Sequence, residues 1–370
     1  MMARKTTLLW LVASLLAVLT GCSSSSSNSN GGSGSSSGST HLAYVSLPSP
    51  NTITGFRINN SSGAFTPIVG SPFPAGDSPG AMLMDPSNQF LYVLNRTEDT
   101  VSLFKIDSNV GSLTEVLPRA STGFSPMAMT MSSAGDMLFV LNQLSGSISV
   151  YSIDSGSGAL AEIKGSPFPT VANPVGFALT PSGKFLYVVN SNLAAVFTYT
   201  VASTGALQQA GAPIPVGAGA FAIAVDPNEK FVYVANTADD TVSILSINST
   251  TGDLTEVNGS PFDTGTSPIS IVVSSSGQYV YIANHGGASI TGYSIDSATG
   301  FPTAITGSPF SASGAPELLV NDPGGNFMYV LGQSLTFVSE MSVDSSSGAL
   351  ASKSQSPDTS TVPVGMAVGK

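Results

Sequence analysis

The stretch from Pro79 to Leu117 reads PGAMLMDPSNQFLYVLNRTEDTVSLFKIDSNVGSLTEVL and decides the fold. It contains four short runs rich in β-branched and aromatic residues, each bounded by Gly, Pro, Asn, Asp or Ser. Runs of this kind are typical of β-strands, and the stretch shows no apolar period of about 3.6 residues that would favour a helix. It therefore predicts four consecutive strands, called A to D in chain order.

A pair formed by an aromatic residue and Val or Ile marks the middle of strand B and recurs along the chain. The copies are separated by 46 to 48 residues: Tyr44-Val45, Tyr92-Val93, Phe139-Val140, Tyr187-Val188, Tyr233-Val234, Tyr281-Ile282 and Tyr329-Val330. Seven copies at this period indicate a propeller or a solenoid, and one four-stranded sheet per repeat indicates a propeller blade. We therefore expect an all-β, seven-bladed β-propeller of four-stranded antiparallel blades.

The two ends of the repeat region predict how the ring closes. The chain enters at a strand B, Leu42–Ser46, and leaves at a strand A, Val364–Lys370. We expect the C-terminal strand to complete the first blade, because closure removes the open sheet edges of the ring.

The tetrapeptide GSPF occurs at Gly70–Phe73, Gly165–Phe168, Gly259–Phe262 and Gly307–Phe310. Each copy is expected to follow a strand D and to precede the next strand A. Gly can end a strand, the residue before Pro is held extended, and Phe can pack on the junction between blades. We interpret GSPF as a structural joint, with a recurring binding loop as the alternative.

The N-terminus predicts export and a lipid anchor. Arg4 and Lys5 precede the apolar run Leu8–Leu19, which is typical of a secretory signal. The sequence Leu19-Thr20-Gly21-Cys22 resembles the lipobox of bacterial lipoproteins, and Cys22 is the single cysteine of the chain. We expect residues 1–21 to be a signal peptide, residues 22–40 a lipidated Cys22 with a Ser/Gly-rich tether, and residues 41–370 the propeller. This places the protein in the bacterial cell envelope, anchored to a membrane on the extracytoplasmic side, either in the outer membrane or on the periplasmic side.

Charge and composition limit the partners. Removal of residues 1–21 leaves 9 basic and 22 acidic residues, a net charge of −13. Such a chain repels nucleic acid, so no nucleic-acid partner is expected. A single Cys and two His exclude disulfides within the chain and leave no convincing metal-ligand cluster, so we predict neither a metal nor a cofactor.

The motifs FLYVLN, FLYVVN and FVYVAN, each followed by a TVS-like strand and an ID…G.L-like turn, resemble the YVTN-type repeats of the seven-bladed lactonase family. This family includes the propeller-type 6-phosphogluconolactonases, and the resemblance covers residues 42–370. It implies a propeller with His, Arg and Glu around the channel mouth on one face. In this chain the matching heads of strand A are Gly80, Met127, Val175, Phe221, Ile269, Glu317 and Val364, and the residues after strand B are Arg96, Gln143, Ser191, Thr237, His285 and Gln333. The resemblance implies a His at the head of strand A and a Glu after strand B, and neither set contains its expected residue type. It implies an Arg where this chain has Glu317, whereas Gln333 still matches the family.

Two readings of function follow, and the missing family residues favour the first. In the first, the protein is a lipid-anchored propeller that binds a glycan, a lactone or a protein on the face of the B–C loops. In the second, it is a divergent lactone hydrolase, a carboxylic-ester hydrolase that uses Glu317 and His285 as catalytic residues. Whether it is an enzyme is left open. In either case we expect ligand contacts from Arg96, Asp99, Asp240 and Gln333.

Overall fold

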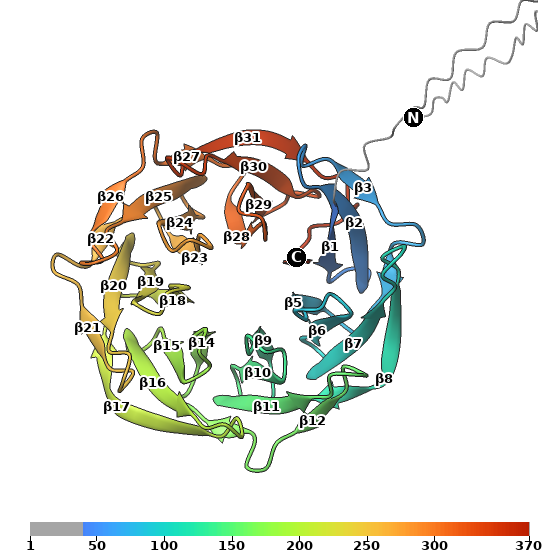
Figure 1. Cartoon of the computed structure of the whole chain (residues 1–370), viewed down its shortest axis with the longest axis horizontal. Coiled ribbons are helices and arrows are strands. Elements are labelled where there is room, and N and C mark those ends of the chain that lie inside the picture. Colours follow the sequence, from blue (N-terminus) through green and yellow to red (C-terminus); the bar gives the residue numbers. More distant parts are fainter. Residues whose placement is uncertain (1–39, 370) are drawn as a thin grey trace, which may run out of the picture. The chain divides into compact units, whose positions relative to one another are not determined.

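The computed structural model describes residues 40–369, which form 32 β-strands and no helix. The strands make seven sheets arranged in a ring, with strand A of each sheet nearest the axis (Figure 1). The predicted seven-bladed β-propeller is thus confirmed. The predicted signal peptide, Cys22 and tether lie outside the described residues, apart from Thr40.

The blades are numbered around the ring, and their strands are given from the axis outward. Blade 1 contains β32 (Gly365–Val368), β1 (Thr40–Leu47), β2 (Thr52–Asn59), β3 (Phe65–Pro67) and β4 (Phe73–Pro74). Blade 2 contains β5 (Pro79–Met84), β6 (Phe90–Asn95), β7 (Thr100–Ile106) and β8 (Leu113–Ser121). Blade 3 contains β9 (Pro126–Met131), β10 (Met137–Asn142), β11 (Ser147–Ile153), β12 (Leu160–Glu162) and β13 (Phe168–Pro169).

The remaining blades repeat the pattern. Blade 4 contains β14 (Pro174–Leu179), β15 (Phe185–Asn190), β16 (Ala195–Val201) and β17 (Leu207–Pro215). Blade 5 contains β18 (Ala220–Val225), β19 (Phe231–Asn236), β20 (Thr241–Ile247), β21 (Leu254–Glu256) and β22 (Phe262–Asp263). Blade 6 contains β23 (Pro268–Val273), β24 (Tyr279–Asn284), β25 (Ser289–Ile295), β26 (Pro302–Ala304) and β27 (Phe310–Ser311). Blade 7 contains β28 (Pro316–Asn321), β29 (Phe327–Gly332), β30 (Ser339–Val343) and β31 (Leu350–Gln355).

The ring closes as the ends of the repeat region predict. The C-terminal strand β32 pairs antiparallel with β1, from Ala43 opposite Val368 to Ser46 opposite Gly365. Blade 1 therefore combines strands from the two ends of the propeller, and β1 is paired on both sides, with β2 and with β32.

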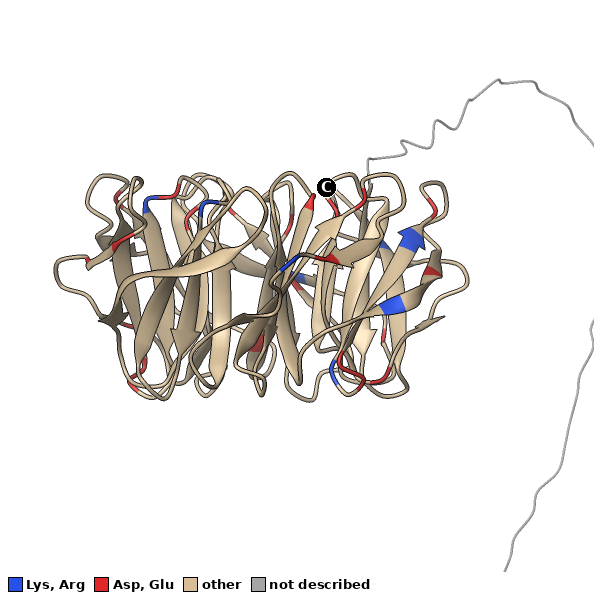
Figure 2. Ribbon diagram, turned by 90° about the horizontal axis from the view of Figure 1, so that it is seen from below, with Lys and Arg blue, Asp and Glu red and all other residues tan. Residues whose placement is uncertain are grey.

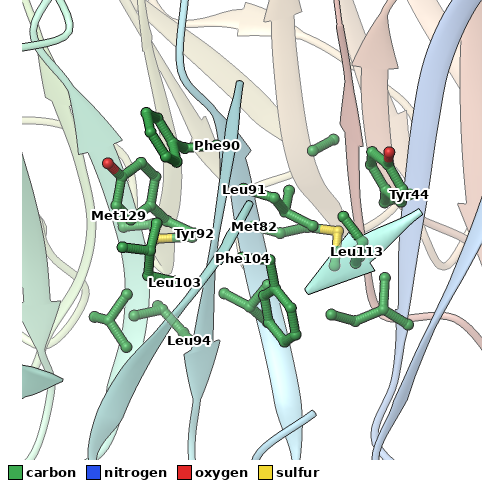
Figure 3. Packing of buried hydrophobic residues seen from close by; sticks show 14 of the residues in the cluster. Tyr44, Met82, Phe90, Leu91, Tyr92, Leu94, Leu103, Phe104, Leu113 and Met129 are labelled. Atoms are coloured by element: carbon green, nitrogen blue, oxygen red, sulfur yellow. The ribbon is translucent and has the colours of Figure 1, made fainter. Parts of the chain in front are cut away.

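Strand B forms the core of each blade. In β6, all six residues of FLYVLN are buried, because this strand has neighbours on both sides within its blade and another blade against each face. Figure 3 shows the result in blade 2, where Leu91, Met82 and Phe104 pack between Tyr44 on one side and Met129 on the other.

In four of the seven blades, the tyrosine of strand B also joins its blade to the next. The Tyr92 hydroxyl donates to the Gly158 carbonyl in the C–D turn of blade 3, at 2.8 Å. Gly158 has a φ of 72°, and a Cβ there would lie 2.7 Å from the Phe90 ring, so this turn requires glycine. Equivalent bonds of 2.6 to 3.0 Å are made by Tyr44, Tyr187 and Tyr281.

GSPF lies within strand D, not after it as expected from the sequence. In blade 1 it separates β3 from β4, and Phe73 resumes pairing with strand C opposite Ile53. Gly70 interrupts the strand with a φ of 87°, and Ser71 Oγ accepts the Gly55 N–H at 2.9 Å in place of a backbone carbonyl. The same Ser contact occurs in blades 3, 5 and 6 at 2.9 to 3.0 Å. GSPF is therefore a structural break in strand D, with its own replacement for the lost ladder bond.

Charged residues are sparse on the strands and lie mainly in the loops of the two faces (Figure 2). One face carries the A–B and C–D turns, and the other carries the B–C and D–A loops. The described residues include no helix that is long and apolar enough to cross a membrane.

Candidate functional site

The head of strand A carries a β-bulge in six blades. In blade 7, Pro316 pairs with Gly332 and Leu318 pairs with Leu331, so Glu317 is left without a partner across the ladder. Bulges of this type re-aim a side chain and are common beside binding sites. The same irregularity leaves out the residue or residues after the first position of strand A in blades 2 to 6.

These bulge residues and their counterpart in blade 1 surround the ring axis on the B–C loop face, because strand A is the innermost strand (Figure 1). We call this set the axial rim. It consists of Gly80, Met127, Val175, Phe221, Ile269, Glu317 and Val364. Apart from buried Gly80, its members are partly exposed, and Glu317 is the single charged residue among them.

A second set of residues follows strand B and is fixed by the backbone. The His285 N–H donates to the Ser267 carbonyl at 2.9 Å, and the Gln333 N–H donates to the Ala315 carbonyl at 2.8 Å. Each bond links the start of a B–C loop to the D–A loop that leads into the same blade. The side chains that follow strand B are thereby held next to the heads of strand A.

The structure brings His285 and Glu317 together across the boundary between blades 6 and 7. His285 Nε2 lies 3.9 Å from Glu317 Oε1, and the two side chains are 30% and 38% exposed. This distance is too long for a direct hydrogen bond and suits one water molecule or one substrate oxygen that contacts both groups. The pair therefore combines a carboxylate with an imidazole at an accessible edge of the axial rim.

The other residues predicted as ligand contacts have different surroundings. Asp99 Oδ1 accepts the Ser125 N–H at 2.8 Å, and Asp240 Oδ1 accepts the Ser267 N–H at 2.7 Å. Both aspartates thus fix the D–A loop of the following blade, a contact that a sequence cannot show because it joins residues 26 or 27 positions apart. In residues 40–369, no hydrogen bond or ion pair joins the side chains of Arg96, Asp99, Asp240 or Gln333 to His285 or Glu317. Their role as ligand contacts stays a prediction.

Arg96 and Gln333 are exposed on the B–C loop face. Arg96 packs its stem against the rim, since a Cβ at Gly80 would lie 2.8 Å from Arg96 Cδ. The second arginine near this face, Arg119, is fully engaged, with Nη1 at 2.6 Å from Glu98 Oε2 and Nε at 2.7 Å from Glu115 Oε1. These two carboxylates neutralise the Arg119 guanidinium, so it is poorly suited to hold an anion.

Hollows also open on the opposite face, between the turns of neighbouring blades. One of about 700 Å³ is lined by Ser182, Glu229 and Lys230 among others. Its charged groups are already used, because the Ser182 N–H donates to Glu229 and Lys230 Nζ donates to the Ser297 carbonyl at 2.9 Å. Within residues 40–369, no group of three or more His, Cys, Asp or Glu side chains is placed to hold a metal ion.

Seven blades, a bulged axial rim and a closing C-terminal strand define the chain as a seven-bladed β-propeller with its candidate site on the B–C loop face. The family model of the lactonase seven-bladed beta-propeller matches residues 35–176 and 175–368. The protein therefore belongs to this lactonase family.

Solved structures agree on the fold. A proposed 6-phosphogluconolactonase from Bacteroides uniformis has a TM-score of 0.76 at 17% identity. The matched region covers 89% of this chain and 99% of the Bacteroides uniformis chain. A second from Bacteroides fragilis has a TM-score of 0.74 at 21% identity, with coverages of 91% and 99%. The periplasmic gluconolactonase of Pseudomonas aeruginosa has a TM-score of 0.75 at 18% identity, with coverages of 90% and 99%. A search of curated proteins finds no match.

Proposed function

We propose that this protein is an exported hydrolase of uncharged lactones, and that His285 and Glu317 carry out the reaction. The observation that supports the proposal is the contact of 3.9 Å between the two side chains at the axial rim. The resemblance implies that the family builds its site from the heads of strand A and the residues after strand B, the positions of Glu317 and His285, although the residue types differ. Membership in a lactonase family supports the class of reaction.

The pair can divide the proton transfers of ester hydrolysis between an acid and a base. Glu317 Oε1 accepts a proton from water, whose oxygen forms a bond to the lactone carbonyl carbon. The ring C–O bond then breaks, and the ring oxygen takes its proton from His285. Glu317 returns its proton to His285, so one lactone and one water give one hydroxy acid. Groups positioned for such transfers contribute about 10²- to 10⁴-fold to a rate.

The charges around the pair favour an uncharged substrate. Glu317 brings a carboxylate to the position where the family is expected to hold a cationic Arg. Of the three arginines in residues 40–369, Arg119 is paired with Glu98 and Glu115, and Arg57 donates to the Asn109 carbonyl at 2.5 Å. A phosphorylated lactone needs cationic groups for its phosphate, and Arg96 alone is left on this face to supply one.

A ligand-binding module without catalysis is the second candidate. The same distance favours it, because 3.9 Å is longer than the direct hydrogen bond that orients a nucleophile or base in a preassembled site. In that case a lactone, a glycan or a protein would occupy the same face and leave unchanged.

Attachment to the bacterial envelope is part of the proposal. The lipobox-like sequence Leu19–Cys22 and the Ser/Gly-rich stretch after it support lipidation at Cys22, and more than one acyl chain gives stable membrane attachment. The protein would then bind its lactone outside the cytoplasm.

The experiment compares the turnover of uncharged lactones by wild type and by Glu317→Gln. Gln keeps the shape of the side chain and removes the base, so kcat/KM should fall by about 100-fold, while the melting temperature changes little because Glu317 is 38% exposed. Glu256→Gln is the matched control, since Glu256 is exposed on the outer strand β21.

The outcomes separate the two candidates. Saturable lactone binding without turnover would establish the binding module. Rapid turnover of 6-phosphogluconolactone that Glu317→Gln leaves unchanged would contradict both the assigned residues and the preference for an uncharged substrate.

A further inference from the structure

The B–C loop face has an uncharged side that the reaction does not use. No Asp, Glu, Lys or Arg occurs in segments 122–127, 143–146, 171–175, 191–194 and 216–221. These segments are the loops and strand heads of blades 3 and 4 and the entry to blade 5. They lie on the same face as the His285–Glu317 pair, which belongs to blades 6 and 7.

Large apolar side chains are exposed on this side. We call them and two rim residues the apolar sector, which consists of Phe124, Leu144, Leu193, Phe221, Met127 and Val175. Phe124 is 69% exposed, Leu144 74%, Leu193 57% and Phe221 38%. They make up half of the eight large apolar residues exposed in residues 40–369. A patch of apolar side chains on one face marks an interaction site, whereas scattered ones do not.

The order of the blades places the apolar sector and the candidate site on either side of one residue of the axial rim. Ile269 stands between Phe221 and Glu317 in the order of the blades, and it belongs to the same blade as His285. A ligand whose reactive group lies at His285 and Glu317 can therefore extend over Ile269 onto Phe221 without crossing a charged side chain of the rim.

We propose that the site takes an uncharged ester or lactone with an aliphatic or aromatic substituent, whose carbonyl lies at His285 and Glu317 and whose substituent lies on the apolar sector. This inference rests on the proposed function and adds the class of substrate. Burial of the substituent against Phe221 and Val175 supplies binding energy through apolar contact.

The charges nearest to the apolar sector support this choice of occupant. Asp99, in the B–C loop of blade 2, accepts the Ser125 N–H at 2.8 Å, next to Phe124. Asp239 and Asp240 lie in the B–C loop of blade 5, and their carboxylates accept the N–H groups of Ala218 at 2.6 Å and Ser267 at 2.7 Å. A cation on the substituent would have to compete with these backbone donors. An anion would find no Lys or Arg in the five segments, so the sector selects against both charges.

The test measures kcat/KM for γ-butyrolactone and for γ-decanolactone, which differ in a six-carbon chain. Wild type should prefer the long-chain lactone, and Phe221→Ala should lower the ratio of long-chain to short-chain kcat/KM about tenfold, since the apolar area lost corresponds to about 1.4 kcal/mol. Val69→Ser is the control. Val69 is 88% exposed in blade 1 and removed from the sector, so the ratio should stay at the wild-type value.

Binding of the matching lactams, which resist hydrolysis, separates failure of this inference from failure of the proposed function. If no lactone is turned over but the long-chain lactam binds more tightly and loses this advantage in Phe221→Ala, the apolar sector holds and the hydrolase proposal is wrong. If lactones are turned over with the same ratio in wild type and Phe221→Ala, the hydrolase proposal holds and the sector is overturned. Binding of lipid vesicles that Phe221→Ala abolishes, without any effect on either lactam, would also overturn it and assign the sector to a membrane surface.

Discussion

Glu340 is a buried carboxylate outside the candidate site. It lies in β30 opposite Tyr329 and is 1% exposed. In the other blades the residue opposite the strand B aromatic is uncharged: Gly55, Leu103, Val150, Thr198, Ile244 and Gly292. Glu340 Oε2 accepts the Ser354 hydroxyl, whereas Oε1 has no hydrogen-bond donor and lies 4.0 Å from Lys353 Nζ.

Burial raises the pKa of Glu340 above its usual value, and the nearby Asp322 adds to the effect against the opposing Ser354 bond and Lys353 charge. A raised pKa in the folded protein means that the fold favours protonated Glu340. Its contribution to stability is therefore complete at pH values below the pKa of the unfolded chain, about 4.5, and is lost as the pH rises through the folded value.

We predict that Glu340→Gln removes this loss. Because Gln does not titrate, the variant should unfold at a higher temperature than wild type near pH 8. Its free energy of unfolding should be higher by about 1–3 kcal/mol, the usual cost of a buried polar group without a partner. The two proteins should converge near pH 4. The measurement is the melting temperature of both proteins from pH 4 to pH 8, with Glu256→Gln as an exposed control. A difference that is constant across this range, or that grows toward low pH, would contradict the prediction.

At the scale of the residue, the repeat supplied the reference for choosing candidate residues. Glu317 could be chosen because its six sister positions carry no charge, and the structure places it beside His285. The loop bonds of Asp99 and Asp240 could not be predicted, because they depend on the approach of the next blade and not on any local pattern. The apolar members of the axial rim could be read from the sequence, but their shared position around the axis could not be predicted, because it depends on the bulges at the heads of strand A.

At the scale of the element, strand boundaries were predictable and the interior of strand D was not. The period and the turn residues located strands A to C, because their apolar runs are bounded by turn-forming residues. GSPF seemed to end strand D because Gly and Pro are poor strand residues. Instead, the Ser71 hydroxyl accepts the N–H of Gly55, and pairing with strand C resumes at Phe73. Such a replacement bond could not be predicted from the sequence pattern.

The closing strand β32 provides an element-scale prediction. Deletion of Pro363–Lys370 should remove the partner of β1 and expose an unpaired edge, because β1 and β32 are paired from Ala43–Val368 to Ser46–Gly365. It also takes away Met366, which is 6% exposed, and burial of such a side chain contributes about 2–5 kcal/mol. We expect the melting temperature to fall by several degrees and the protein to associate through the open edge. Thermal unfolding and light scattering measure both effects.

Removal of Lys370 alone is the control for this deletion, since it leaves β32 (Gly365–Val368) whole. Cooperative unfolding of the longer deletion at the wild-type midpoint would show that β32 does not close the ring.

At the scale of the molecule, the architecture could be predicted because the repeat defines it seven times over. Each copy alone is ambiguous, but a common period with four strands per copy leaves the propeller as the solution that buries both faces of every sheet. Function does not follow in the same way, because the repeated residues such as Tyr92 build the scaffold. The candidate site depends on single departures from the repeat, such as Glu317 and His285, and their proximity becomes apparent only when the ring is assembled.

We predict that Cys22 attaches the molecule to the membrane. Cys22 ends the lipobox-like sequence Leu19–Cys22 and is the single thiol in the chain, so Cys22→Ser removes the one side chain that can receive a lipid by thioether chemistry. In a bacterial host, wild type should be labelled by a fatty-acid probe and sediment with membranes. The variant should carry no label, and should either keep residues 1–21 as a precursor or appear as soluble protein after cleavage by another peptidase. Ser23→Ala is the matched control, because it changes the neighbouring residue and leaves the thiol in place. Equal labelling of wild type and Cys22→Ser would show that Cys22 is not the anchor. Complete release of the variant from membranes would show that no second anchor holds the protein there.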